Sequence, residues 1–321
     1  MNKPLALCVM LLAAIVPHAA SGGNVEENIV ISQPKMADQA TISETVKVNE
    51  VTVTCIRDNK AERTMPLSLF GNIPESLIDS LGIRNGIKSS VNAILVKTEE
   101  ATILFDTGLG KSDSQLLTAL SNKPEDIKFI YLTHFHGDHI GGMMKGDKPV
   151  FTNAEVYASR EEYESWMKMP DEAKAQVVKT MKAYEKHLHL FEFGDTLPGN
   201  VIALDGSGHT PGHTIYNVDN EVLVAGDIIH GMALQLSHPE YCASYDMNKE
   251  KAIRTRKRIL NYAREHKIDI TGMHIPLPGI NPIVMRLKCL RKKQNYRIED
   301  IKQQYSDRIT ERRENNKVNP P

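Results

Sequence analysis

Residues 134–139 read His134-Phe135-His136-Gly137-Asp138-His139 and place three imidazoles and one carboxylate within six positions. An apolar run, residues 127–132, precedes this hexapeptide, so its polar side chains follow the end of a predicted strand. Three more His or Asp residues stand in glycine-containing turns after apolar runs. Because strand ends in an α/β protein converge on one edge of the sheet, we expect these side chains to meet there. The predicted group contains His134, His136, Asp138, His139, His209, Asp227 and His274.

These side chains form a donor set for divalent metal ions. His134 and His136 are two positions apart and can face one ion, whereas Asp138 and His139 then turn toward a second. Imidazole nitrogen and carboxylate oxygen suit Zn²⁺, with Mn²⁺, Fe²⁺ and Co²⁺ as alternatives. The group is large enough for two ions that share a carboxylate, and two ions that share a water molecule make a hydrolytic centre.

The rest of the chain predicts strands and helices in alternation. Residues 46–56 alternate between apolar and polar side chains, which is typical of a half-buried strand. Apolar, β-branched runs predict further strands, and segments rich in Lys and Glu predict surface helices. The predicted strands are 46–56, 91–97, 102–105, 127–132, 154–158, 201–204, 215–218, 222–224 and 268–271, and the predicted helices are 74–81, 113–120, 160–167, 171–187 and 249–265.

The segment from Leu132 to Gly142 resembles the metal-binding motif of the metallo-β-lactamase superfamily. Residues 208–213 (Gly-His-Thr-Pro-Gly-His) and 225–227 (Ala-Gly-Asp) are similar to later motifs of that superfamily and follow in the same order. The runs 226–230, 237–240 and 273–279 make the chain most similar to the branch that contains methyl parathion hydrolase, with acyl-homoserine lactone lactonases as cousins. The resemblance covers residues 46–282.

The resemblance implies an α/β fold, an αβ/βα four-layer sandwich with two facing mixed β-sheets, outer helices and metals at one edge. It implies that one ion is held by His134, His136 and His209. It implies that a second ion is held by Asp138, His139 and His274, and that Asp227 bridges the two. Asp138 and Asp227 are then the catalytic residues, and a hydroxide between the metals is the nucleophile.

Several further residues are candidates for the surroundings of this centre. Asp106 follows a predicted strand and either accepts a hydrogen bond from a ligand imidazole or caps the turn. His213 has a counterpart in the superfamily that is not a ligand, so we expect a structural role. Four residues could line the pocket, with packing or surface exposure as the alternative: His230, His238, Tyr241 and Tyr245.

The two ends of the chain differ from its middle. Residues 1–21 have a positive start, a short apolar core and small residues at the end, which predicts a secretory signal peptide and export to a periplasm or beyond. Residues 22–45 are predicted to be a linker or arm, and the metallo-β-lactamase-like domain spans 46–282. The tail, 283–321, is basic; from residue 286 it holds eleven Lys or Arg against five Asp or Glu. No strand pattern closes the sheet in residues 287–293.

The charge and the apolar content of the chain limit the classes of binding partner that we expect. A formal net charge of −1 gives no reason to expect nucleic acid or an anionic membrane as a partner. The apolar run near the start is too short to span a membrane as a helix, so we expect no stable membrane span after signal cleavage. We therefore expect a small-molecule substrate. A homodimer is possible by analogy, through the segment 65–70.

The leading hypothesis is an exported, dinuclear metal-dependent hydrolase that cleaves a lactone, a carboxylic ester or an organophosphate ester. One alternative is a β-lactamase-type amide hydrolase, although Asp227 stands where many β-lactamases place Cys. Another is a non-catalytic metal-binding protein whose tail docks a partner.

Overall fold

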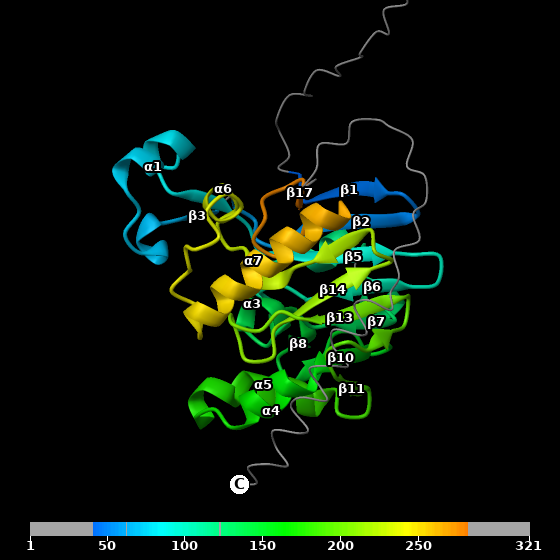
Figure 1. Ribbon diagram of the computed structural model, residues 1–321. Helices are drawn as coiled ribbons and strands as arrows, with labels where there is room; N and C mark the ends of the chain where they lie inside the picture. The colour runs from blue at the N-terminus through cyan, green and yellow to red at the C-terminus, as the bar shows by residue number, and fades with distance from the viewer. Residues whose placement is uncertain (1–40, 62, 122, 282–321) are drawn as a thin grey trace, which may run out of the picture. The chain divides into compact units, whose positions relative to one another are not determined.

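The structure, a computed structural model, describes residues 41–281 with the exception of residues 62 and 122. Two β-sheets form its framework (Figure 1). The first has the strand order β1 (Ser43–Val48), β2 (Val51–Arg57), β5 (Asn92–Lys97), β6 (Thr102–Phe105), β7 (Phe129–Tyr131), β10 (Glu155–Ser159) and β11 (Leu188–Phe191). The second has the order β12 (Thr196–Leu197), β13 (Val201–Asp205), β14 (Thr214–Val218), β15 (Val222–Val224), β16 (Asp269–Thr271) and β17 (Ile280–Asn281).

Both sheets are mixed. In the first sheet β6, β7, β10 and β11 pair in parallel, while β1, β2, β5 and β6 pair antiparallel. In the second sheet only β15 and β16 pair in parallel. Two short antiparallel strand pairs, β3 (Arg63–Met65) with β4 (Ile87–Ser89) and β8 (Met144–Lys145) with β9 (Lys148–Pro149), lie outside the two large sheets.

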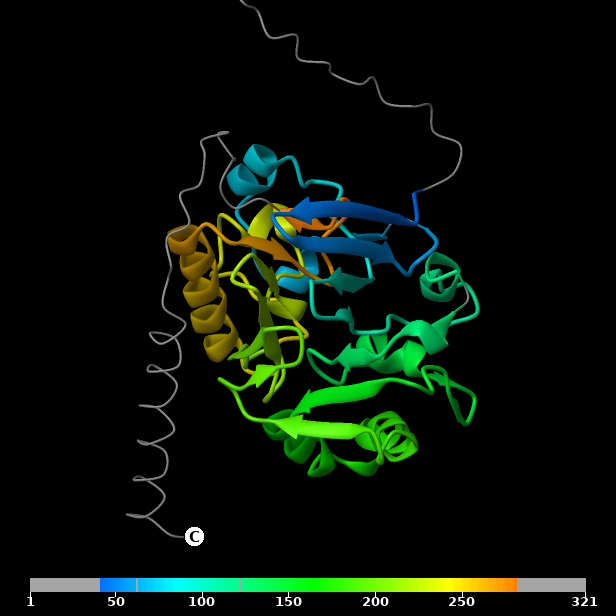
Figure 2. The same ribbon diagram turned by 90° about the vertical axis from the view of Figure 1, so that its right-hand side faces the viewer.

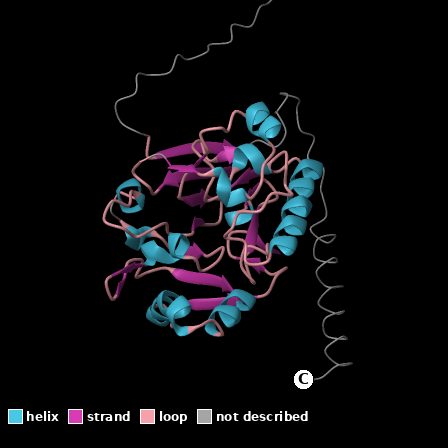
Figure 3. Ribbon diagram, turned by 90° about the vertical axis from the view of Figure 1, so that its left-hand side faces the viewer, coloured by secondary structure: helices cyan, strands magenta, loops and turns pink. Residues whose placement is uncertain are grey.

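The helices are, in chain order, α1 (Glu75–Leu81), α2 (Leu116–Ala119), α3 (Gly137–Ile140), α4 (Arg160–Met167), α5 (Asp171–Ala183), α6 (Met232–Gln235) and α7 (Lys249–His266). Figure 3 shows the longer helices outside the strands, and Figure 2 shows α7 beside the second sheet.

Three apolar clusters hold these layers together. The first contains Val53 and Val96 from one sheet and Val218 and Val224 from the other, so the two sheets face each other. The second joins the outer face of the first sheet to α4 and α5. The third joins the outer face of the second sheet to α7. Each fully buried aliphatic side chain stabilises this packing by about 1.5–3 kcal/mol. The predicted four-layer sandwich is therefore confirmed.

The long helix α7 illustrates how the sequence sets an element. Its first turn is capped by Asn248, whose side chain accepts a hydrogen bond of 2.9 Å from the backbone N–H of Lys251. Residues Ile259, Leu260 and Ala263 share one face and are buried against the second sheet. The helix ends at His266, and the next residue, Lys267, caps it with a left-handed φ of 56°.

The predicted strand 46–56 is wrong, because the structure has a hairpin there. β1 ends at Val48 and β2 begins at Val51, with Asn49 at a positive φ of 52° in the turn. Asn tolerates this conformation better than most residues, so the turn is built into the sequence. β1 also begins at Ser43, three positions before the predicted domain boundary.

The end of the second sheet also differs from expectation. A short strand, β17, pairs antiparallel with β16 through Ile270–Asn281 and Thr271–Ile280. The second sheet is thus completed by β17, which precedes the basic tail in the sequence. The predicted signal peptide, most of the predicted arm and the tail itself lie outside the described residues. In residues 41–281, leaving aside 62 and 122, no helix is long and apolar enough to cross a membrane.

Candidate metal centre

The polar residues predicted from the sequence follow the ends of four strands. His134 to His139 come after β7, with His139 buried in the one-turn helix α3. His209 follows β13, Asp227 follows β15, and His274 follows β16. These segments are far apart in sequence, yet the fold brings all seven side chains together in two of the four candidate groups of metal-ligand atoms found among the described residues; the other two groups include His230.

The first group consists of three imidazoles and Asp227. The Nδ1 atom of His136 lies 2.9 Å from Nε2 of His134 and 2.9 Å from Nε2 of His209, and those two Nε2 atoms are 3.2 Å apart. Around one tetrahedral zinc ion, with zinc–nitrogen bonds of about 2.0–2.1 Å, ligand nitrogens are separated by about 3.3 Å. The observed spacing is close to that of a common coordination centre.

The second group consists of Asp138, His139 and His274. The Asp138 carboxylate lies 3.7 Å from Nε2 of His139 and 3.7 Å from Nε2 of His274. Asp138 is the more exposed acid of the centre, whereas both imidazoles are buried. This group therefore has one side open to solvent, as a site that admits a substrate requires.

Asp227 lies between the two groups. Its Oδ2 atom is 3.4 Å from Nε2 of His209 in the first group, and 3.3 Å and 3.0 Å from Nε2 of His139 and His274 in the second. Burial alone would raise the pKa of this carboxyl group, but His139 and His274 outweigh that effect and hold it well below its usual value. Asp227 is therefore an anion shared by both groups.

The donor set fits divalent cations. Within the described part of the chain, Nε2 of His139 and Oδ1 of Asp227 are buried and have no hydrogen-bond partner. Unpartnered buried polar atoms cost free energy, and ligation of a cation would satisfy them. The mixture of imidazole and carboxylate suits Zn²⁺, Mn²⁺, Fe²⁺ or Co²⁺. That these residues act as ligands stays a prediction.

Two imidazoles of the first group, those of His134 and His136, are held neutral. Burial lowers the pKa of His134 well below its usual value, and burial together with His209 lowers the pKa of His136 to about 3. A neutral imidazole has a free nitrogen lone pair, which is the form that binds a metal ion.

Two carboxylates and one backbone carbonyl contact Nδ1 of three of the candidate ligands, on the side away from Nε2. Nδ1 of His139 lies 2.6 Å from Oδ2 of Asp106, and Nδ1 of His209 lies 3.0 Å from Oδ1 of Asp246. Nδ1 of His274 faces the backbone carbonyl of Ser90 at 2.8 Å. An acceptor at Nδ1 fixes the proton there and leaves Nε2 free for a metal. Of the two alternatives for Asp106, contact with a ligand imidazole is the one observed.

Glu162 connects two of the ligand loops and was not predicted. This buried carboxylate of α4 accepts hydrogen bonds from the backbone N–H of Phe135 (3.1 Å) and from Nε1 of Trp166 (2.6 Å). Its other oxygen accepts from the Thr210 hydroxyl and the Gly212 N–H, both at 2.8 Å. The segments that carry His136 and His209 are thereby fixed to the same helix.

His213 has the structural role that the sequence suggests. Its Nε2 accepts a hydrogen bond of 2.9 Å from the backbone N–H of Asp227 and so positions the shared carboxylate. His238 lies away from the seven side chains, and its Nδ1 is 3.3 Å from Glu240. Tyr241 contributes backbone carbonyl contacts, whereas Tyr245 is 49% exposed.

His230 lies at the centre itself. Its Nε2 is 3.4 Å from Oδ2 of Asp227, and its ring stacks on His274 with a centroid separation of 5.3 Å. Neither ring nitrogen has a hydrogen-bond partner among the described residues. Burial lowers the pKa of His230 to about 4, although Asp227 opposes this, so the ring is neutral at pH 7. Of the two alternatives, lining the site is therefore the better description.

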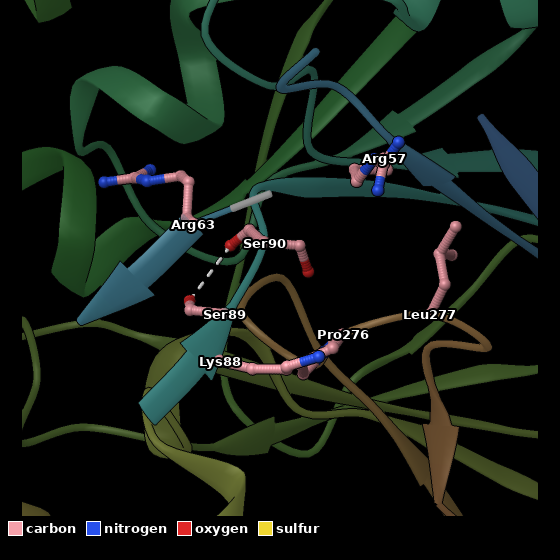
Figure 4. Close-up of a pocket in the computed structure, with 7 residues that line it drawn as sticks. All are labelled: Arg57, Arg63, Lys88, Ser89, Ser90, Pro276 and Leu277. Carbon is pink, nitrogen blue, oxygen red and sulfur yellow. Dashed lines mark hydrogen bonds between the residues drawn. The ribbon is translucent and has the colours of Figure 1, made fainter. Parts of the chain in front are cut away.

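A separate pocket of about 140 Å³ is lined in part by Ser90, whose backbone carbonyl contacts His274 (Figure 4). Its walls come from Ser89 and Ser90 on one side and Pro276 and Leu277 on the other, together with Arg57, Arg63 and Lys88. Figure 4 shows the Arg63 guanidinium directed away from the other basic side chains, so the positive charges do not gather at one point. The Ser90 hydroxyl donates to the Ile275 carbonyl at 2.9 Å, which ties together the two segments that orient His274.

Sequence comparison gives a family for this chain. A model of the metallo-beta-lactamase superfamily matches residues 86–264, a range that contains six of the seven predicted ligands and excludes only His274.

Three curated relatives match parts of the chain. It is 29% identical over 189 residues to the uncharacterized protein YobT of Bacillus subtilis (strain 168), which covers 54% of this chain and 79% of YobT. It is 31% identical over 121 residues to exodeoxyribonuclease WalJ of Streptococcus pneumoniae serotype 2, a match that covers 37% of this chain and 41% of WalJ. It is 27% identical over 158 residues to an N-acyl homoserine lactonase of Bacillus sp, a match that covers 49% of this chain and 54% of the lactonase. The chain thus spans about half or less of the two named enzymes.

Two solved structures have a similar fold over most of their length. The hydrolase AbOPH of the beta lactamase superfamily superposes with a TM-score of 0.68 and 28% identity, covering 76% of this chain and 94% of AbOPH. AidC, a dizinc quorum-quenching lactonase solved with the product N-hexnoyl-L-homoserine, gives a TM-score of 0.67 and 25% identity, covering 80% and 100%.

Proposed function

This chain belongs to the metallo-beta-lactamase superfamily, and we propose that it is an exported hydrolase that holds two divalent metal ions and cleaves lactone, carboxylic ester or organophosphate ester bonds. Its assignment as a superfamily hydrolase rests on the family match and on the hydrolases among its structural neighbours. Export rests on the sequence pattern of residues 1–21 alone.

One observation carries the proposal. A single carboxylate oxygen, Oδ2 of Asp227, lies within 3.4 Å of imidazole nitrogens that belong to two separate donor groups. We infer that His134, His136 and His209 hold one ion, that Asp138, His139 and His274 hold the other, and that Asp227 bridges them. Zinc is the favoured ion, because nitrogen and oxygen donors suit it and AidC is a dizinc enzyme.

When bound, the two ions supply a water of lowered pKa and polarise the oxygen of the bond to be cleaved. The side chains around them position the charges. Asp106, Asp246 and the Ser90 carbonyl fix the proton of a ligand imidazole on Nδ1. Asp138, whose pKa is lowered chiefly by His139 and His274 against the effect of burial, is ionised at pH 7 and can accept a proton at its carboxylate.

His230 is placed to contact the substrate. A neutral imidazole carries one N–H, and neither ring nitrogen of His230 makes a hydrogen bond among the described residues, although Oδ2 of Asp227 lies 3.4 Å from Nε2. It can therefore donate a hydrogen bond to the oxygen that gains negative charge during ester cleavage. Removal of one such donor typically slows the catalysed step by about 10²–10³-fold.

The apolar residues near the centre support a small, partly apolar substrate. Tyr245 and Met247 flank Asp246 and are two of the three large hydrophobic side chains that are strongly exposed in the described region. Tyr245 lies 5.8 Å from the His230 ring, measured between centroids. The lactonase among the structural neighbours was solved with an acylated product, and an acyl chain is the kind of group these side chains would contact.

The test is hydrolysis by the purified protein of a panel that contains a lactone, an aryl ester, an organophosphate triester, a β-lactam and single-stranded DNA. Turnover of one of the first three that disappears on chelation and returns with zinc supports the proposal. The variant His230→Ala should lower kcat with little change in metal content, whereas the matched variant His238→Ala, at an imidazole outside the centre, should leave both unchanged. Turnover of only the β-lactam or DNA, or none by metal-loaded protein, would overturn it.

A further inference from the structure

Arg256 is the largest fully buried side chain in the described part of the protein. It lies on the face of α7 that packs against the second sheet, four positions before Leu260 and three before Ile259. A buried guanidinium is costly unless its charge is paired and its N–H groups are bonded. The partners of Arg256 therefore indicate which part of the structure the buried guanidinium stabilises.

All the polar partners of Arg256 come from one segment, residues 228–246. Nε donates to the backbone carbonyl of Ile228. Nη1 donates to the carbonyls of Pro239 and Tyr241, both at 2.9 Å. Nη2 donates to Oδ2 of Asp246 at 3.1 Å, a buried ion pair. One planar cation thus binds the start, the middle and the end of the segment that connects β15 to α7.

Both ends of this segment lead to the candidate metal centre. Ile228 directly follows Asp227, the carboxylate shared by the two donor groups. Asp246 uses its other oxygen, Oδ1, to contact Nδ1 of His209 at 3.0 Å. The backbone reinforces this contact, because the N–H of Met247 donates to the His209 carbonyl at 3.0 Å. Arg256 therefore binds the residue next to Asp227 and, through the carboxylate of Asp246, is connected to His209.

We propose that Arg256 is a positioning residue of the metal centre, which sets the relative placement of Asp227 and His209 and so tunes the affinity of the ion that they share. This inference rests on the proposed function. A guanidinium is required because it presents N–H groups in a fixed planar fork, and the short ammonium donor of a Lys cannot reach three directions at once. Asp246 acts as the intermediate, since it accepts from both Arg256 and His209.

The alternative is that Arg256 only stabilises the fold. The two differ in what they predict for a folded variant that lacks the guanidinium. Outer partners of metal ligands typically contribute about 10–100-fold in metal affinity. A residue that is only structural lowers the melting temperature but leaves the affinity of the folded protein unchanged.

The experiment compares Arg256→Met, Arg256→Lys and Asp246→Asn with Ile259→Ala, a matched control on the same buried face of α7. Zinc affinity is measured by competition with a chromophoric chelator, and the visible spectrum of the cobalt-substituted protein reports ligand geometry. We expect Arg256→Met and Asp246→Asn each to weaken zinc about 10–100-fold and to change the cobalt spectrum. Arg256→Lys should recover part of the affinity, and Ile259→Ala should lower only the melting temperature.

A double variant tests the connection directly. If Arg256 acts through Asp246, combining Arg256→Met with Asp246→Asn should weaken zinc little more than either change alone. Wild-type affinity and an unaltered cobalt spectrum in a folded Arg256→Met protein would overturn the inference and leave the proposed function standing. If Arg256→Met does not fold, Asp246→Asn decides in the same way. Failure of the wild-type protein to bind zinc would instead overturn the proposed function.

Discussion

At the scale of single residues, the centre is a set of titratable groups that compensate one another. Burial lowers the pKa values of His134 and His136. Burial alone would also lower those of His139 and His274, but Asp227 and the other acids outweigh it and raise both. His134 and His136 are therefore neutral and able to bind a cation, whereas the raised pKa values of His139 and His274 favour the protonated forms, which a cation must displace.

This difference predicts that zinc binding releases protons at pH 7. The pKa of His139 is well above its usual value, so this imidazole carries an additional proton in the metal-free protein, and the raised pKa of His274 favours protonation there too, whereas a metal ion requires the neutral forms. Calorimetric titration in buffers of different ionisation enthalpy measures the release, which should decrease as the pH is raised. Asp106→Asn removes a charge that raises the pKa of His139 and should reduce the release. A binding enthalpy that is the same in every buffer would contradict this assignment.

A second residue-scale prediction concerns Glu162. In Glu162→Gln one carboxylate oxygen becomes an NH₂ group that cannot accept the hydrogen bonds now made by Phe135, Trp166, Thr210 or Gly212. A buried unsatisfied group costs about 1–3 kcal/mol, so the free energy of unfolding should fall by that amount in chemical denaturation of the metal-free protein. Glu164→Gln, at an exposed position of the same helix, is the control and should have little effect. Equal stability of both variants would show that Glu162 does not hold the loops.

Sequence reasoning identified the residues that face the centre better than those behind them. The seven candidate ligands are recognisable because each His or Asp follows an apolar run, and six of them lie within the family match. Glu162, Asp246 and Arg256 carry no such local pattern. Apart from Trp166, which lies four positions from Glu162, the partners cited for them lie 10 to 50 positions away in sequence, and only the folded chain brings them together.

At the scale of elements, α3 and the turn after it approach the segment 107–110 very closely. A Cβ atom on Gly142 would lie 2.0 Å from the Thr107 carbonyl oxygen, and one on Gly141 would lie 2.3 Å from that of Leu109. The Thr107 N–H and hydroxyl both donate to the His139 carbonyl, at 2.7 Å and 2.8 Å. The absence of side chains at these glycines therefore lets α3 present Asp138 and His139 to the centre.

We predict that Gly142→Ala both destabilises the protein and weakens zinc binding. The new methyl group must push α3 away from Thr107, and such overpacking costs about 1–3 kcal/mol. Thermal unfolding and zinc competition measure the two effects. Gly146→Asn is the control, because no atom lies within 4 Å of a Cβ there and Asn tolerates the positive φ of 64°. Unchanged zinc affinity in Gly142→Ala would show that the placement of α3 does not depend on this contact.

The order of elements was largely predictable, and their fine boundaries were not. The strands β6 and β15 and the helix α4 have the predicted limits, because turn residues flank clear apolar or amphipathic runs. The hairpin of β1 and β2 was missed because valines continue on both sides of a two-residue turn. The closing strand β17 was missed because two residues carry too little pattern to be recognised.

At the scale of the whole molecule, the two sheets enclose an apolar core that contains Cys55. The side chain is fully buried, and burial raises the pKa of its thiol, with a smaller contribution from Glu44. Since the thiolate is the reactive form, this cysteine is inert in the folded state. It reacts only when the sheets separate.

Modification of Cys55 should therefore report global opening and its dependence on metal. Zinc at 100 times its dissociation constant stabilises the folded state by about 2.7 kcal/mol for each bound ion. Alkylation of Cys55 at pH 8, followed by mass spectrometry, should accordingly slow about 100-fold for each bound ion, and so about 10⁴-fold for two, when zinc is added under conditions where opening is at equilibrium. Cys242 is only partly buried, so it serves as the internal comparison. A zinc-independent rate at Cys55 would mean that the ions do not stabilise the sandwich.

The central claim is that two divalent ions share Asp227, and the most direct test is a count of bound zinc. Metal-free protein is saturated with zinc, freed of excess ion and analysed for zinc per chain, beside Asp227→Asn and the control His238→Asn. We predict two ions per chain in the wild type and in His238→Asn, and fewer than two in Asp227→Asn, because the shared carboxylate lies within 3.4 Å of both donor groups. Two tightly held ions in Asp227→Asn, or no zinc in the wild type, would contradict the account.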